Sequence, residues 1–305
     1  MLYLANELIC KENKMLSITE EQNQNTVDID IKNGYEIAKL INNEDKKVAL
    51  AVEKELENIG KAIDELAKRI NKGGRVAYFG AGTSGRIGIL DASEMPPTFG
   101  AKSSMFQAYI AGGNKAVRKS VENSEDNAEF ASADFAKFNP KENDVVVAIS
   151  ASGNPPYVVE IMRLGRQKGI LTIAVSSNPN AKMRQFADIF INPIVGAEAV
   201  TGSSRMKAGT AQKMVLNMLS TGAMIKIGKT YKNYMIDLRA TNEKLQARAI
   251  RFIKEITGAD DKQAEKALQQ SKSVKIACVM IAKKCPIKQA KKLLNENGGI
   301  LRKIL

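Results

Sequence analysis

Five short apolar runs separated by helix-length intervals restrict the fold of this chain more than any other feature. They lie near residues 75–79, 104–110, 144–150, 170–176 and 188–192. Near-continuous apolar runs rich in Val and Ile are typical of strands buried on both faces, and such strands form parallel sheets covered by helices. The sequence therefore predicts an α/β fold in which a parallel five-stranded sheet is flanked by helices.

A loop rich in glycine and hydroxyl groups, GAGTSGR, follows the first predicted strand. It contains Gly82, Thr83 and Ser84, and a helix-like stretch that carries Glu94 comes next. A strand, a tight loop and a helix N-terminus make an anion site, because unpaired backbone N–H groups and the positive end of the helix dipole point at one spot. A carboxylate one short helix beyond a phosphate site indicates chemistry on a phosphorylated substrate.

The glycine spacing of this loop also fits the dinucleotide-binding fingerprint, which is a weak signal alone. That fingerprint normally comes with an acidic residue roughly 20 positions further on. The next predicted strand ends in AGG without Asp or Glu, and the loop carries two consecutive hydroxyls where a cofactor loop mainly needs room. A turn that merely connects strand to helix would not need Thr, Ser and Arg within four residues. A compact phosphate ester is therefore the favoured ligand.

Further polar loops follow the later strands. The loop after the third strand contains Ser150, Ser152 and Asn154. Ligands of parallel sheets bind beyond the carboxyl ends of the strands, so two hydroxyl-rich loops at that edge can converge on one anion. Loops of Ser and Gly also occur simply as turns. We predict a phosphate site formed by Ser150 and Ser152 together with the first loop, and an additional substrate contact from Asn154.

Another polar cluster precedes a long helix predicted at about 206–227. It contains Ser203, Ser204, Arg205 and Lys207. The plain interpretation is a helix cap followed by a basic first turn. Because positive charge is unfavourable at that end of the helix dipole, the two cations require an anion or an acidic partner. These four residues are therefore candidates for additional substrate contacts.

The complete absence of histidine excludes several kinds of enzyme. Ser-His-Asp and Cys-His hydrolases are excluded, as are metal sites built on imidazole. Acid–base work near neutral pH must come from Glu, Asp, Lys, Tyr or Cys. The three cysteines, Cys10, Cys278 and Cys285, lack metal-ligand spacing and indicate free thiols in a reducing compartment. We expect no metal site.

The net charge of +13 is concentrated towards the C-terminus. Residues 230–305 contain 17 Lys and Arg against 7 Asp and Glu. Because these cations are scattered at helical intervals without alternating aromatics, a solvated surface is favoured over a nucleic-acid surface. No apolar stretch is long enough to span a bilayer, and no secretory signal is apparent. We expect a cytoplasmic protein that binds neither nucleic acid nor membrane.

Five motifs together resemble the N-acetylmuramic acid 6-phosphate etherases, bacterial enzymes of the sugar isomerase (SIS) superfamily. They are GAGTSGR, LDASEMPPTFG, SASGNPPYV, NPIVGAEAVTGSSRMKAGTAQK and ATNEKL. The match runs from about Leu16, through TEEQN, to Leu305. The resemblance implies an SIS core, a homodimer and a small C-terminal helical domain, without a metal or organic cofactor. We expect a helical arm at 1–56, the SIS domain at 57–229 and the helical domain at 230–305.

The resemblance also implies a reaction and its residues. The family cleaves the D-lactyl ether at C3 of the sugar by C2 deprotonation, elimination and water addition, giving N-acetylglucosamine 6-phosphate and D-lactate in cell-wall amino sugar recycling. Glu94 corresponds to its proton donor, and Glu125 to its second glutamate, the base. Glu122, three residues away, is the alternative for that role. If these residues are not catalytic, Glu94 is a carboxylate on a helix surface, and Glu125 is a helix N-cap or a solvated charge.

Three other functions compete with the etherase. A binding module such as animal glucokinase regulatory protein shares the core and senses sugar phosphates, but it carries two SIS domains where this chain has room for one. An aldose–ketose isomerase shares C2 deprotonation, but many SIS isomerases employ a histidine. A DNA-binding regulator would place a helix-turn-helix before the core, and residues 1–56 contain too few basic positions for one.

Overall fold

The predicted parallel sheet is present in the computed structural model, which describes residues 18–238 and 243–305. Residues 1–17, with Cys10, and residues 239–242, which include the start of the ATNEKL motif, lie outside the described part. The sheet consists of β1 (Val76–Gly80), β2 (Phe106–Ile110), β3 (Val145–Ile149), β4 (Leu171–Val175) and β5 (Ile189–Ile191). Their order is β2-β1-β3-β4-β5, and every neighbouring pair is parallel. From β1 the chain adds β2 on one side and then β3 on the other, so the strand order reverses between β1 and β3. Ligands of such sheets bind at this switch point.

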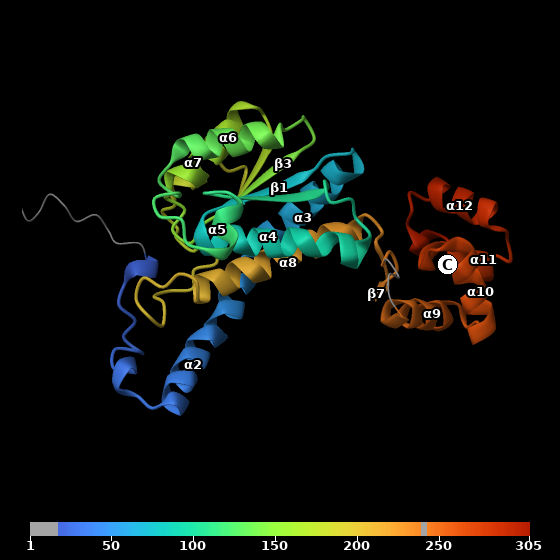
Figure 1. Ribbon diagram of the computed structural model, residues 1–305, viewed down its shortest axis with the longest axis horizontal. Helices are drawn as coiled ribbons and strands as arrows, with labels where there is room; N and C mark the ends of the chain where they lie inside the picture. Colours follow the sequence, from blue (N-terminus) through green and yellow to red (C-terminus); the bar gives the residue numbers. More distant parts are fainter. Residues whose placement is uncertain (1–17, 239–242) are drawn as a thin grey trace, which may run out of the picture.

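Helices cover both faces of the sheet (Figure 1). One face carries α2 (Gly34–Glu53), α3 (Leu56–Asn71), α4 (Gly82–Phe99) and α8 (Lys207–Lys226), and the other carries α6 (Ala128–Phe138) and α7 (Pro156–Gln167). The short α5 (Asn114–Arg118) follows β2. Tyr78 packs into the first hydrophobic cluster and Phe79 into the second. This alternation follows from the two-residue period of a strand, and it accounts for the fully buried apolar runs.

The glycine-rich loop after β1 is shorter than the sequence predicts. Helix α4 already begins at Gly82, so most of the GAGTSGR motif is helical. Glycine is required here because strand and helix approach closely: a Cβ on Gly80 would lie 2.7 Å from the backbone nitrogen of Gly85. The strand therefore turns directly into the helix, and the helix N-terminus lies at the carboxyl edge of the sheet.

The N-terminal segment is tied to the loop that follows β5. It contains the 3-10 helices η1 (Ile18–Glu20) and η2 (Ile29–Ile31). The side chain of Asn23 donates to the carbonyl of Ala197 at 3.0 Å, and that of Thr26 donates to the carbonyl of Ala199 at 2.9 Å. Apolar residues of α2 also join the hydrophobic cluster on the first face of the sheet. Residues 18–53 thus pack closely on the α/β core, and the boundary at residue 56 remains a prediction.

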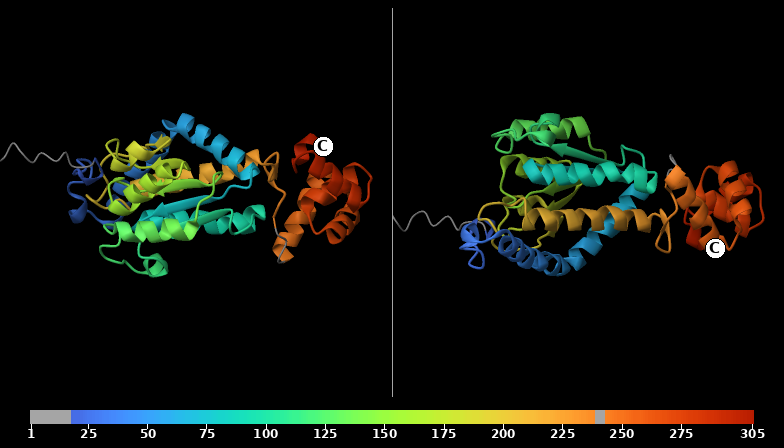
Figure 2. Two further views of the ribbon diagram at one scale, coloured as in Figure 1. Left: turned by 90° about the horizontal axis from the view of Figure 1, so that it is seen from above. Right: turned by 60° about the horizontal axis from the view of Figure 1, so that its bottom comes forward.

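The C-terminal residues form a helical bundle with its own apolar cluster. A two-stranded ribbon, β6 (Thr230–Tyr231) and β7 (Tyr234–Met235), leads to α9 (Glu243–Thr257), α10 (Asp261–Ser271), α11 (Val274–Ala282), α12 (Ile287–Glu296) and η4 (Leu301–Lys303). Figure 2 shows the bundle at the opposite end of the molecule from residues 18–31. Cys278 and Cys285 are buried free thiols within it. Within the described ranges, no helix has the length and apolar character needed to cross a bilayer.

Candidate active site

A cavity of about 350 Å³ lies at the carboxyl ends of β1 and β3, and we call it the cradle pocket. The start of α4, the loop after β3, the loop before α8 and the N-terminal segment all contribute to its wall. Its lining residues include Thr19, Glu20, Gly82, Thr83, Ser84, Glu125, Ser150, Ser152, Gly202 and Ser204. The five residues predicted to bind phosphate thus line one cavity together with Glu125.

The cradle pocket offers hydrogen-bond donors rather than cations. Ala81, which precedes α4, makes no capping hydrogen bond with its side chain, so N–H groups of the first helical turn are free to face an anion. Ser150 Oγ accepts from the backbone N–H of Gly153 at 3.0 Å. Its own proton therefore remains available for donation. No Lys or Arg occurs among the described residues that line this pocket. Such a lining suits an anion held by hydrogen bonds and the helix dipole.

A second cavity of about 340 Å³ adjoins the first, and we call it the Arg86 pocket. It shares Gly82 and Glu125 with the cradle pocket, whereas Glu122 lines the Arg86 pocket alone. The residues around Glu122 and Glu125 form turns, with Asn123 at φ 56°, so the two glutamates do not share a helix face. The backbone carbonyl of Glu125 accepts from the N–H of Tyr157 at 3.0 Å. Its position between the two pockets favours Glu125 over Glu122 for chemistry beside a bound phosphate.

Glu94 lines neither pocket and is exposed on α4. It lies three turns beyond Thr83 on the same face of the helix, which corresponds to roughly 16 Å along the axis. The structure of one chain therefore does not bring Glu94 and Glu125 into one cavity.

Asp91, in the same DASE motif, has a buried position. Its carboxylate accepts from the hydroxyl of Tyr78 at 2.8 Å, the amide of Asn217 at 2.6 Å and the hydroxyl of Ser220 at 3.0 Å. Burial raises the pKa of Asp91, although these hydrogen bonds oppose the shift. This network joins α4 to β1 and α8, so it fixes the helix on which Glu94 is carried.

Four further candidates for substrate contact lie outside both pockets: Asn154, Ser203, Arg205 and Lys207. The buried Lys207 ammonium lies 2.6 Å from Glu44. Glu198 accepts from the backbone N–H groups of Lys207 and Ala208 at 2.8 and 2.9 Å, at the N-terminus of α8. The protein thus supplies the acidic partners of Lys207 itself, and Lys207 is not free to contact substrate. Asn154 is occupied as an acceptor for the backbone N–H of Lys182.

Thr19 and Glu20 line the cradle pocket, and reasoning from the sequence missed both. A Cβ on Gly202 would lie 3.2 Å from a carboxylate oxygen of Glu20. Gly202 has φ +77°, a backbone conformation that favours glycine. The missing side chain also leaves room for the carboxylate of Glu20. The TEEQN motif was the available signal, but in the sequence it indicated only where the family match begins.

The fold and the loops at the carboxyl edge define an SIS-domain protein. Residues 120–222 match the SIS domain family model, and residues 58–165 match that of the glucokinase regulatory protein N-terminal SIS domain. Residues 232–272 match the C-terminal lid domain of glucokinase regulatory protein.

Whole-chain comparison narrows this class to one family. The chain is 50% identical over 285 residues to the N-acetylmuramic acid 6-phosphate etherase of Clostridium botulinum strain Okra, covering 93% of this chain and 94% of the relative. It is also 50% identical to the etherase of Caldanaerobacter subterraneus subsp. tengcongensis, covering 93% of each. The etherase of Clostridium beijerinckii is 49% identical, with 94% of this chain and 95% of the relative covered. The chain belongs to the N-acetylmuramic acid 6-phosphate etherase family.

Proposed function

We propose that this protein cleaves the D-lactyl ether of N-acetylmuramic acid 6-phosphate, giving N-acetylglucosamine 6-phosphate and D-lactate. The observation that carries the proposal is the position of Glu125, which lines the same cavity as the hydroxyls of Thr83, Ser84 and Ser150. A base must lie near the phosphate site if it is to act on C2 of a 6-phosphosugar. Family membership favours the same substrate.

The proposed mechanism uses two carboxylates in opposite protonation states. The cradle pocket binds the 6-phosphate through Thr83, Ser84, Ser150 and Ser152. In the open-chain aldehyde, Glu125 removes the acidified C2 proton. Glu94 protonates the departing lactate oxygen as the C3–O bond breaks, and water then adds to the unsaturated aldehyde at C3. No step needs an oxidant or a reductant, because the elimination and the hydration together amount to hydrolysis of the ether.

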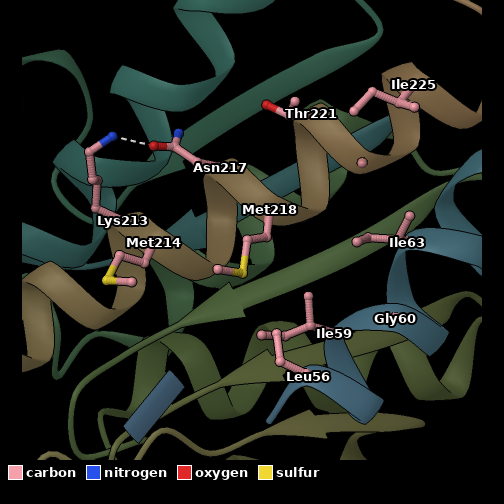
Figure 3. A pocket seen from close by; sticks show the side chains of 11 residues that line it. Leu56, Ile59, Gly60, Ile63, Lys213, Met214, Asn217, Met218, Thr221 and Ile225 are labelled. Atoms are coloured by element: carbon pink, nitrogen blue, oxygen red, sulfur yellow. Dashed lines mark hydrogen bonds between the residues drawn. The ribbon is translucent and has the colours of Figure 1, made fainter. Parts of the chain in front are cut away.

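A homodimer is part of this proposal, because one chain keeps Glu94 away from the cradle pocket. An apolar groove of about 610 Å³ lies between α3 and α8. Figure 3 shows Ile59 and Ile63 of α3 facing Met214 and Met218 of α8 across it. We assign this groove to a second copy of the chain. Helix α4 is hydrogen-bonded to α8 through Asp91 and Asn217, and Asn217 lines the groove. A second copy bound in the groove would therefore also lie near α4, the helix that carries Glu94.

The dimer and its shared site can be tested by mixing subunits. Glu94→Gln and Glu125→Gln homodimers should each be inactive, and reassociated mixtures should regain part of the activity if each site takes one glutamate from each subunit. Persistent inactivity of mixed dimers would place both glutamates in one chain. A monomer in solution would contradict the dimer.

The activity itself is tested by incubating the purified protein with N-acetylmuramic acid 6-phosphate and assaying D-lactate. Release that depends on enzyme concentration supports the etherase. We place the protein in the cytoplasm, because charged sugar phosphates do not diffuse across bilayers.

The second candidate is a sugar-phosphate sensor, favoured by the two matches to glucokinase regulatory protein. That function predicts saturable binding of sugar phosphates without release of D-lactate. The same incubation, followed by calorimetry with N-acetylglucosamine 6-phosphate, distinguishes the two functions.

A further inference from the structure

Arg86 lies at the candidate site, and none of the described acidic residues forms an ion pair with it. Its Nε donates to the carbonyl oxygen of Val117 at 2.9 Å. Among the described residues, none accepts a hydrogen bond from its Nη atoms. Glu122 and Asp126 line the same pocket, yet neither forms an ion pair with it. The hydrogen bond to Val117 fixes the orientation of the guanidinium, and its Nη groups remain available to donate to a ligand.

Arg86 also brings a positive charge to the Arg86 pocket. In the described part of the chain, no other Lys or Arg lines either the cradle pocket or the Arg86 pocket. Because three carboxylates line the Arg86 pocket, an anion could enter it only with a compensating positive charge. The guanidinium of Arg86 provides that charge, and its planar fork of donors fits a carboxylate.

The order of the groups matches a substrate with two anionic ends. The hydroxyls of the cradle pocket lie on one side, Arg86 lies on the other, and Glu125 lines both cavities between them. N-acetylmuramic acid 6-phosphate carries its phosphate at C6 and the lactyl carboxylate on the C3 ether. The reacting atoms C2 and C3 lie between these ends.

We propose that Arg86 binds the carboxylate of the lactyl group and selects substrates that carry it; this inference rests on the proposed etherase function. Sugar phosphates without the carboxylate gain nothing from this contact. Arg86 thus separates the etherase substrate from the many phosphosugars that a phosphate cradle alone would accept.

The test combines two enzymes with two substrates, the natural acid and its lactyl carboxamide. Arg86→Gln is the informative variant, because the glutamine amide nitrogen occupies the position of arginine Nε and can still donate to Val117. Arg118→Gln is the matched control, because Arg118 is exposed, lies next to Val117 and lines neither pocket. The constant measured is kcat/KM for D-lactate or lactamide release.

The wild type should prefer the acid over the carboxamide about tenfold or more, as expected for a hydrogen bond between charged groups. Arg86→Gln should lose a similar factor on the acid and little on the carboxamide, whereas Arg118→Gln should match the wild type. The inhibition constant of N-acetylglucosamine 6-phosphate, which lacks the lactyl group, should stay unchanged in Arg86→Gln.

Equal losses of Arg86→Gln on both substrates would assign Arg86 to the phosphate or to the fold and overturn the inference. A wild type that does not distinguish acid from carboxamide would also overturn it, even if the variant failed to fold. Failure of the proposed function looks different, because the wild type would then release no D-lactate from the natural acid.

Discussion

The ammonium of Lys207 lies 2.6 Å from a carboxylate oxygen of Glu44, although 163 residues separate them in the chain. Both side chains are buried. Asn25 donates to the other carboxylate oxygen of Glu44 at 3.0 Å. This contact joins α2 and the N-terminal segment to the first residue of α8, next to the loop that brings Ser204 into the cradle pocket. The N-terminal segment is therefore held by charge as well as by apolar packing.

Breaking this pair should destabilise the protein strongly. Lys207→Met removes the buried cation and leaves the buried Glu44 paired with Lys47, whose side chain is half exposed. Losing one partner of a buried pair typically costs about 3–5 kcal/mol. Adding Glu44→Gln should recover part of that loss, because it removes the buried negative charge that Lys207 no longer neutralises. The measurement is the free energy of unfolding in urea. Lys226→Met is the control, because its ion pair with Asp64 is exposed at the surface, and it should cost less than about 1 kcal/mol. Equal costs for the two lysine variants would contradict the buried role of Lys207.

The same carboxylate should make the protein sensitive to acid. Burial acts to raise the pKa of Glu44, but hydrogen bonds from Lys207 and Lys47 outweigh it and lower the pKa from 4.5 to about 2. A group whose pKa is lowered by folding stabilises the protein above its unfolded pKa, and that stabilisation is lost as the pH falls towards the folded pKa. The difference in unfolding free energy between wild type and Glu44→Gln should therefore shrink as the pH falls from about 5 towards 3. A constant difference over that range would refute the assignment.

Ser84→Ala should weaken substrate binding. Ser84 lines the cradle pocket at the uncapped start of α4, and a hydrogen bond to a charged group contributes roughly 1.5–3 kcal/mol. KM should therefore rise about tenfold or more. Ser93→Ala, on the exposed face of the same helix, is the control and should leave KM unchanged. If KM is unchanged in both variants, the phosphate lies elsewhere.

The strands were predictable because burial on both faces leaves a local signal. All five apolar runs became strands within a few residues of their expected bounds, since a sheet covered by helices tolerates few polar side chains. The start of α4 was harder to predict. Gly82 and Gly85 look like loop residues in the sequence. Gly85 is required because helix and strand approach closely, since a Cβ there would lie 2.7 Å from the carbonyl oxygen of Gly80, whereas Gly82 has φ +51° and meets nothing within 4 Å.

Parts of the site were not predictable because they depend on contacts distant in sequence. In the sequence, Lys207 looked like a cation that binds an anion. Its pairing with Glu44 could not be predicted, because it depends on how α2 packs against α8. Glu20 reaches the cradle pocket through hydrogen bonds between the N-terminal segment and the loop after β5, which no local pattern encodes. The convergence of Thr83 and Ser150 was predictable, because parallel strands place their carboxyl ends at one edge.

Gly202→Ala should impair activity more than its effect on stability explains. The new Cβ would lie 3.2 Å from the Glu20 carboxylate and would push it within the cradle pocket. Gly196→Ala is the matched control: Gly196 has φ +71° against +77° for Gly202, but a Cβ there meets nothing within 4 Å. Both variants should lose a similar stability of about 1 kcal/mol from the left-handed backbone, and only Gly202→Ala should change KM or kcat. The same kinetic change in both variants would show that Glu20 is not involved.

Glu125→Gln and Glu94→Gln should fail at different steps of the reaction. If Glu125 is the base, its variant should lose both D-lactate release and exchange of the C2 proton with solvent deuterium. If Glu94 only protonates the leaving group, its variant should lose lactate release but retain some C2 exchange, because the earlier step does not need that proton. General acid or base catalysis contributes about 10²–10⁴-fold, so both losses of lactate release should be large.

The measurement is proton NMR or mass analysis of substrate recovered from D₂O after incubation with each variant. Glu122→Gln is the matched control, because Glu122 lines only the Arg86 pocket while Glu125 lines both cavities. It should retain exchange and lactate release. Exchange that persists in Glu125→Gln and disappears in Glu94→Gln would reverse the two roles. Full activity in Glu125→Gln with loss in Glu122→Gln would transfer the base to Glu122, and the phosphate would then have to lie close to the Arg86 pocket.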